Sequence, residues 1–128
     1  MNEGLMNIKD VKILTKDELK EFKNTNSNYD AEKEYNIAGF KKNQNDWVII
    51  KGGWDKYRDY PYVDVRIWYS DKETGRKKPG KAGMRMTPAQ WALFSVLIKV
   101  HSKELGFDQN AENNLNYYLN NETLDAMR

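Results

Sequence analysis

The sequence predicts an α+β fold in which short strands precede one long helix, and three observations support this prediction. Residues 62–70 alternate between apolar and polar side chains, as a half-buried strand does. Residues 35–42 and 47–51 are β-prone segments separated by a polar break at 43–46. Residues 87–104 begin with a helix-start signal and continue with many apolar residues. The chain of 128 residues suits one small domain with extensions.

The first 34 residues read as an acidic extension. They carry six lysines against eight acidic residues, although the whole chain has a net charge of +2. Thr15 precedes Glu18 by three residues, which is the spacing of a capping box. We therefore expect a short helix that starts at Thr15 and ends at about Lys23.

The strand predicted over residues 62–70 has two different faces. We expect the apolar face to be buried and the polar face to be exposed and functional. The apolar face holds Val63, Val65, Ile67 and Tyr69, and the polar face holds Asp64, Arg66, Trp68 and Ser70. Gly52-Gly53 permits a bend or bulge before Trp54. A turn-rich loop then leads to a short segment at 84–86.

The helix predicted after Thr87 has a strong start and an unusually wide apolar face. Pro88 follows the capping hydroxyl and Gln90 completes the capping box, while Gly106 lies just beyond the expected end at about Glu104. Its apolar side chains cover roughly 220° of the helix circumference, far more than the usual stripe. One sheet cannot cover such an arc, so we expect this helix to pair with a second copy of itself.

The pattern divides the chain into three parts. Residues 1–34 form the acidic extension, residues 35–105 the predicted domain, and residues 106–128 an Asn-rich tail with a weak helix around 115–119. The longest apolar runs are too short to span a membrane, and the N-terminus lacks the apolar region of an export signal. We therefore expect a soluble protein.

Composition argues against most catalytic and metal-binding classes. The chain has no cysteine and a single histidine, which excludes disulfides, thiolate chemistry and multi-histidine metal sites. His101 fits a helix-packing role better than that of a general base. Residues 75–81 match G-x-x-x-x-G-K, but Ala82 stands where a phosphate-binding loop needs Ser or Thr, and no helix is predicted directly after it. We expect no enzyme activity, no cofactor and no metal.

A basic block occupies the middle of the chain. Residues 41–85 contain twelve basic and six acidic residues, so both flanks are acidic relative to this block. A solvated face could explain the charge alone. The block also contains seven large aromatic residues, and cations with aromatic rings are the two components of a groove for single-stranded nucleic acid. These aromatic residues are Trp47, Trp54, Tyr57, Tyr60, Tyr62, Trp68 and Tyr69.

The order of several motifs resembles the positive cofactor four family of transcriptional coactivators. The segment YVDVRIWY at 62–69 resembles its V-D-I-R strand, and KPGKAGMRM at 78–86 its K-P-G loop and strand. TPAQW at 87–91 is similar to the start of its helix. The resemblance covers residues 35–104 and implies a curved four-stranded antiparallel sheet followed by one helix, the Whirly-like fold for binding single-stranded DNA. It also implies dimerisation through the helices.

The resemblance suggests roles for individual residues. Arg66 matches the strand arginine that contacts the nucleic-acid backbone, and Trp54 resembles the stacking aromatic of the second strand. Tyr69 falls where the family has a stacking tryptophan, but Trp68 shares a face with Arg66, so both stay candidates. The predicted nucleic-acid contacts are Lys42, Lys51, Trp54, Lys56, Arg58, Arg66, Trp68, Tyr69, Lys78 and Lys81, and the predicted dimer contacts are Trp91, Phe94, Leu97, Ile98 and His101.

Three departures from the family pattern affect the groove. Ala82 replaces a usual lysine, Gln44 lies near a basic position of the first strand, and residues 58–62 lengthen the loop between the second and third strands. They concern individual contacts rather than the presence of a groove.

The resulting hypothesis is a homodimeric protein that binds single-stranded DNA without sequence preference. It would act like a coactivator in transcription, replication or repair, with transcription or replication proteins as further partners. An RNA-binding module is the alternative, because the same contacts tolerate RNA. We expect it in the nucleoid or cytoplasm of a bacterial or viral system, or in a eukaryotic nucleus.

Overall fold

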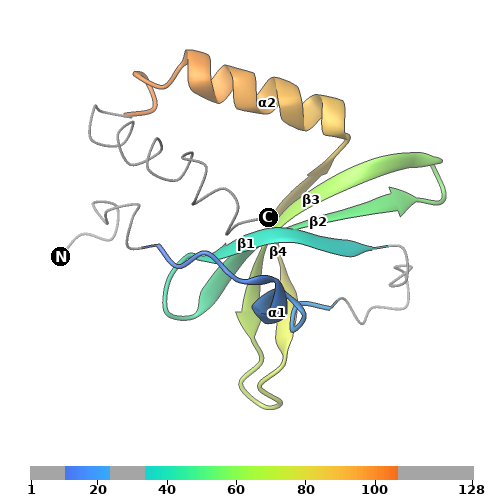
Figure 1. The fold of residues 1–128 in the computed structure, drawn as a ribbon, viewed down its shortest axis with the longest axis vertical. Coiled ribbons are helices and arrows are strands. Elements are labelled where there is room, and N and C mark those ends of the chain that lie inside the picture. The colour runs from blue at the N-terminus through green and yellow to red at the C-terminus, as the bar shows by residue number, and fades with distance from the viewer. Residues whose placement is uncertain (1–10, 24–33, 107–128) are drawn as a thin grey trace.

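The computed structural model describes residues 11–23 and 34–106, which form one antiparallel sheet and two helices (Figure 1). The expected helix around 115–119 lies outside the described residues, as do residues 1–10, 24–33 and the rest of 107–128. The α+β class and the four-stranded antiparallel sheet are confirmed. The elements are α1 (Lys16–Leu19), β1 (Tyr35–Lys41), β2 (Asp46–Asp55), β3 (Tyr60–Ser70), β4 (Lys77–Met86) and α2 (Pro88–Val100).

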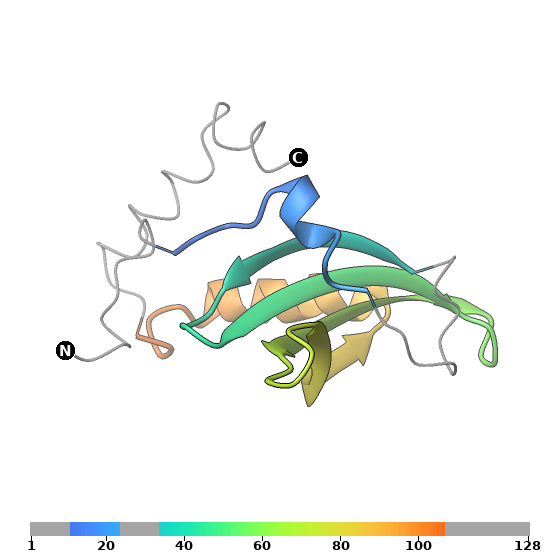
Figure 2. The same cartoon turned by 90° about the horizontal axis from the view of Figure 1, so that it is seen from below.

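The sheet has the order β1-β2-β3-β4, and its strands are visibly curved (Figure 2). β2 and β3 pair without a register shift from Asp46 opposite Tyr69 to Asp55 opposite Tyr60. No bulge therefore lies at Gly52-Gly53, where we expected a bend or bulge. A Cβ atom on Gly52 would lie 2.4 Å from the Tyr35 ring, so the glycine makes room for a side chain on the sheet.

Register shifts occur instead at the two outer strand pairs. One lies between Asn36 and Ala38 in β1, and the other lies between Arg66 and Trp68, where β3 pairs with β4. β4 is also longer than expected because it starts at Lys77 and includes Pro79. Since β4 is an edge strand, proline can be accommodated there without breaking a ladder on both sides.

Residues 11–23 pack on the sheet and complete its core. Leu14 N–H donates to the Gly39 carbonyl at 2.9 Å, which ties the segment to the edge strand β1. Phe22 is 1% exposed and makes edge-on contacts with Trp47 and Trp68 at 5.6 and 5.7 Å between ring centroids. The buried cluster consists of Leu14, Leu19, Phe22, Ile49 and Trp68.

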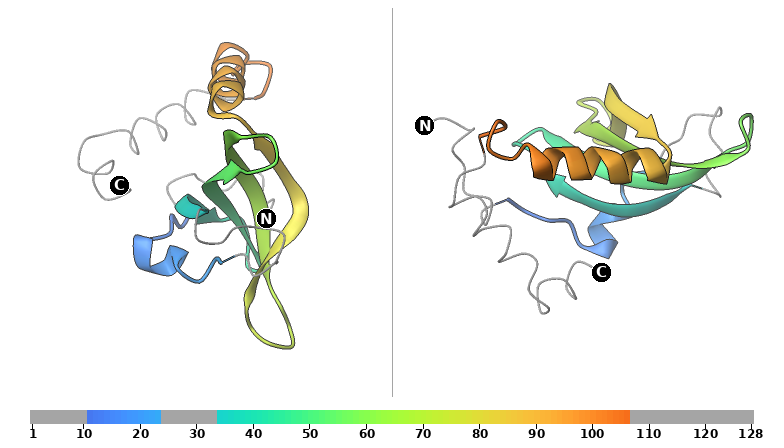
Figure 3. Two further views of the ribbon diagram at one scale, coloured as in Figure 1. Left: turned by 90° about the vertical axis from the view of Figure 1, so that its right-hand side faces the viewer. Right: turned by 90° about the horizontal axis from the view of Figure 1, so that it is seen from above.

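This cover reverses the expected exposure of β3. The strand alternates as predicted, but Asp64 and Trp68 of the supposedly exposed face are buried, whereas Tyr69 of the apolar face is exposed. The physical reason is that apolar side chains of residues 11–23 lie over the face that carries Trp68. The sheet itself lies between α1 and α2 (Figure 3).

Both helix starts were predicted correctly, and both helices are shorter than expected. Thr15 with Glu18, and Thr87 with Gln90, form complete capping boxes. α1 nevertheless ends at Leu19, and α2 ends at Val100 with turns continuing to residue 106. No side chain of α2 is buried in the single chain. Within the part of the chain that is described, neither helix has the length and apolar character to cross a membrane.

Candidate nucleic-acid interface

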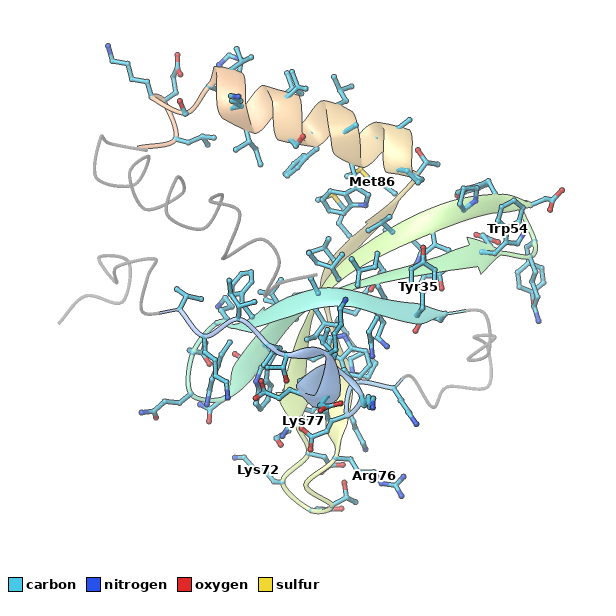
Figure 4. All side chains as sticks on the ribbon, viewed as in Figure 1. Tyr35, Trp54, Lys72, Arg76, Lys77 and Met86 are labelled. Carbon is cyan, nitrogen blue, oxygen red and sulfur yellow. The ribbon has the colours of Figure 1, made fainter. Side chains whose placement is uncertain are left out.

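Most of the exposed cations of the sheet and its connecting turns, together with Trp54, Tyr57 and Tyr69, lie at the two hairpin ends of the sheet. Trp54 lies near the tip of the β2–β3 hairpin, while Lys72 and Arg76 lie on the turn between β3 and β4 (Figure 4). The sheet body between these ends holds the buried candidates Lys51 and Trp68. The predicted contacts thus fall into two exposed groups and one covered group.

The β2–β3 tip is ordered by its own hydrogen bonds. The Asp55 carboxylate accepts from the backbone N–H groups of Tyr57 and Arg58 at 3.0 and 3.1 Å. Asp59 adopts a positive φ of 58° and its N–H donates to the Asp55 carbonyl at 2.7 Å. Trp54 Nε1 donates to Asp59 Oδ1 at 3.2 Å. These contacts fix the turn while Trp54 and Tyr57 stay 45% and 85% exposed.

Cations flank the aromatic rings of this tip. Lys56 Nζ lies 5.4 Å from the centre of the Tyr57 ring. Arg58 Nη1 donates to the Tyr60 hydroxyl at 3.3 Å, and this contact raises the pKa of the guanidinium further. Tyr57 was not among the predicted contacts. The sequence signal for Tyr57 is its position between Lys56 and Arg58 in a lengthened hairpin, where an aromatic ring lies between two cations.

Arg66 lies on the covered face and holds two strands together. Its Nε and Nη2 donate to the Asp64 carboxylate at 3.1 and 3.0 Å, and its Nη1 donates to the carbonyls of Gly80 and Lys81 at 3.1 and 3.2 Å. Asp64 also lies 3.5 Å from Arg85 Nε. The guanidinium is therefore strongly engaged, and any phosphate contact would share it with Asp64.

Lys51 and Trp68 form the covered group. Lys51 Nζ donates to the Phe22 carbonyl and lies 4.9 Å from the Trp68 ring and 3.6 Å from Glu34 Oε1. Burial lowers the pKa of this amine, and the charge of Glu34 opposes that effect. Trp68 is 1% exposed, so a base cannot reach its ring in this conformation. Of the two β3 candidates, Tyr69 has the accessible ring, at 42% exposed.

The β3–β4 end carries a second exposed group of cations. Tyr69 pairs with Lys78 across the strands, and Lys78 Nζ lies 2.6 Å from Asp71 Oδ2. Their hydrogen bond raises the pKa of Lys78 and lowers that of Asp71. Lys42 and Lys81 are exposed, on the turn after β1 and on β4 respectively.

Two further sequence predictions concern the G-x-x-x-x-G-K pattern and metal binding. Residues 75–81 lie in a turn and in β4, so no helix follows the G-x-x-x-x-G-K pattern. Among residues 11–23 and 34–106, no three His, Asp or Glu side chains are grouped to hold a metal ion.

α2 presents an apolar surface next to the sheet. Trp91 Nε1 donates to the Val63 carbonyl at 2.7 Å, and the Trp91 and Phe94 rings meet edge-on at 5.5 Å. Phe94 and Leu97 are 40% and 50% exposed. Ile98 is half-buried, and the exposed His101 caps the helix, with Nδ1 3.8 Å from Glu104 Oε2.

A curved antiparallel sheet with aromatic and basic hairpin ends, followed by one apolar helix, places the chain in the α+β class. The comparison with protein families agrees with this class. Residues 53–95 match the family model described as Transcriptional Coactivator p15 (PC4), which confirms the resemblance predicted from the sequence. The match runs from the end of β2 to the middle of α2. No curated protein and no solved structure matches the chain.

Proposed function

We propose that this protein is a homodimer that binds single-stranded DNA without sequence preference and acts like a transcriptional coactivator. The observation that carries the proposal is the pair of exposed rings, Trp54 and Tyr69, each beside exposed cations on one curved sheet. Stacking on aromatic faces tolerates every base, and lysine or arginine contacts bind the repeated phosphates. The family match over residues 53–95 supports the same function. Replication and repair are further processes in which such binding is useful.

Within this proposal the predicted contacts take different roles. Trp54 and Tyr69 stack bases, and the hairpin cations Lys56 and Arg58 bind phosphates together with Lys42, Lys78 and Lys81. Arg66 and Lys51 position β3, β4 and residues 11–23 from the covered face. Trp68 belongs to the core.

The proposed dimer uses α2. Its exposed apolar side chains include Leu93, Val96, Leu97 and Val100, each at least half exposed in the single chain. A second copy would bury this surface, with the five predicted helix residues at or near the contact. We also propose that the folded domain begins at residue 11 rather than at residue 35, because Leu14, Leu19 and Phe22 complete its core.

A competition titration tests the function. A labelled single-stranded DNA oligonucleotide bound to the protein is challenged with unlabelled single-stranded DNA, duplex DNA or RNA of the same length. We expect single-stranded DNA to compete better than duplex DNA, because exposed bases are needed for stacking. Stronger competition by RNA would favour the RNA-binding alternative, and equal competition by duplex DNA would contradict a stacking interface.

A further inference from the structure

A hollow of about 550 Å³ lies between the end of the N-terminal segment and the turn that joins β3 to β4. Its walls come from parts of the chain that are far apart in sequence, and four of its side chains are basic against one carboxylate. In Figure 4, Lys77 lies near α1, and Arg76 lies on the turn below it. The lining residues are Glu21, Lys23, Thr74, Gly75, Arg76, Lys77 and Lys78.

The wall formed by Glu21 and Lys23 is anchored by the residue between them. Phe22 is 1% exposed and packs edge-on against two tryptophan rings. Its carbonyl also accepts a hydrogen bond from the buried Lys51 ammonium group. Lys23 therefore leaves the core at a fixed point beside the hollow.

The opposite wall is a hydrogen-bonded turn. Asp71 N–H donates to the Arg76 carbonyl and Gly75 N–H donates to the Asp71 carbonyl, both at 2.8 Å. Gly75 has a φ of 73°, a conformation that glycine adopts without strain. Arg76 N–H donates to the Thr74 hydroxyl at 3.3 Å, which fixes the start of its side chain. Both walls are thus formed before any ligand binds.

The basic side chains of the hollow differ in how far they are already engaged. Lys77 Nζ donates to Ser70 Oγ at 3.2 Å and lies 4.4 Å from the Trp47 ring, and Lys78 pairs with Asp71. Lys23 and Arg76 make no ion pair with any residue in the described ranges. Two cations that no acid of the described residues neutralises, in a concave site, favour a compact oxyanion, because charge-assisted hydrogen bonds to phosphate are strong.

We propose that this hollow binds one phosphate group of a bound nucleic-acid strand, with Lys23 and Arg76 as its main ligands. The proposal rests on the proposed single-strand binding and extends it to residues outside the predicted contacts. Lys78 belongs both to those contacts and to the hollow, so a strand held at Lys78 passes its opening. The bound group is either an internal phosphodiester or a terminal phosphomonoester, and both present the same oxyanion chemistry.

The test compares a double variant, Lys23→Ala with Arg76→Ala, with a matched control, Lys99→Ala with Lys103→Ala. Each double variant removes two exposed positive charges. Lys99 and Lys103 of the control variant lie on α2 and just after it, and neither lines the hollow. Binding of single-stranded DNA carrying a 5′-phosphate or a 5′-hydroxyl is titrated over a range of salt concentrations. Thermal unfolding and sedimentation establish that fold and assembly are unchanged.

We expect the hollow variant to bind about tenfold more weakly than the control variant, given the usual strength of hydrogen bonds to charged groups. The magnitude of its salt slope should fall by about 0.7 for each hollow, as loss of one phosphate contact requires. A loss of affinity confined to the 5′-phosphorylated strand would show that the hollow binds the terminal phosphate. An equal loss with both strands would show that it binds an internal phosphodiester. Glu21→Gln should tighten binding, because it removes the one carboxylate in the lining.

Equal affinities and salt slopes for the hollow and control variants, with normal binding by the unmodified protein, would overturn this inference alone. No binding of single-stranded DNA by the unmodified protein would overturn the proposed function and the hollow's role with it.

Discussion

Trp54 and Trp68 lie on neighbouring strands of one sheet, and different surroundings give them different roles. Trp68 is enclosed by Phe22, Ile49 and the Lys51 ammonium group, whereas the Trp54 ring is 45% exposed and only its N–H is held, by Asp59. Burial makes a tryptophan important for folding, and exposure beside cations suits base stacking. Under the proposed function, the two residues therefore separate stability from binding.

Alanine substitutions measure this separation. Trp68→Ala should lower the free energy of unfolding by about 3–5 kcal/mol, because it leaves a large cavity in the core. Trp54→Ala should leave unfolding nearly unchanged and weaken single-stranded DNA binding by about 1–3 kcal/mol, with little change in salt slope. Urea unfolding and anisotropy titrations of both variants provide the comparison. A strong loss of stability in Trp54→Ala with normal binding by its folded fraction would contradict the stacking role.

We expect the Glu18 carboxylate to make α1 sensitive to acid. Hydrogen bonds from Lys12 and then from the Thr15 N–H lower the pKa of Glu18 from 4.5 to about 2. A carboxyl whose pKa is lower in the folded state stabilises that state above pH 4.5, and this contribution disappears as the pH falls toward 2.

We therefore expect the apparent stability of the segment around α1 to decline between about pH 4.5 and pH 2, as monitored by the NMR signals of residues 15–19. Glu18→Gln should remove that part of the pH dependence because the amide does not titrate. An identical acid profile in this variant would show that the capping box does not cause the decline.

At the level of elements, α2 exposes several large apolar side chains in the single chain. Leu93, Leu97 and Val100 are 60%, 50% and 67% exposed, although the helix is anchored to β3 through Trp91. In the proposed dimer, a second copy of the same helix would bury this surface symmetrically.

Leu97→Asp should convert the proposed dimer into a monomer or prevent folding, because a carboxylate would be buried in the interface. Ser95→Asp places the same charge on the polar side of the helix and should leave assembly unchanged. Sedimentation equilibrium at micromolar concentration measures both. A stable monomer of the unmodified protein under these conditions would contradict the dimer.

The elements that were predicted well depend on local chemistry. Both capping boxes and the β3 alternation follow from residues within one helical turn or one strand. The predicted burial of the β3 faces was wrong because the observed burial depends on Leu14, Leu19 and Phe22. These residues lie in a segment that we interpreted only as an acidic extension. The length of β4 was underestimated because Pro79 and two glycines are residues that usually argue against a strand. β4 includes them as an edge strand with an irregular register.

At the level of the candidate site, residue types were easier to predict than accessibility. The basic block identified the exposed cations of both hairpin ends, such as Lys56 and Lys78. It could not separate them from Lys51, which is 5% exposed because the N-terminal segment covers it. Lys23 was not predicted at all, because it meets the β3–β4 turn only through tertiary packing.

For the whole molecule, charge distribution matters more than net charge. The chain carries only +2, yet its excess of cations lies in residues 41–85 and reaches solvent mainly at the two ends of the sheet. Phosphate contacts release counterions from nucleic acid, so binding through these ends must weaken as salt is raised. Hydrophobic or purely hydrogen-bonded recognition would not show this dependence.

The salt dependence of affinity for a single-stranded DNA oligonucleotide therefore tests whether these cations bind phosphate groups. If each subunit engages about four phosphates, a dimer engages about eight, and the slope of log affinity against log salt should lie near −5 to −6, from about 0.7 per phosphate. Anisotropy titrations at several salt concentrations give this slope. Affinity that stays nearly constant as salt is raised would contradict a nucleic-acid interface built from these cations.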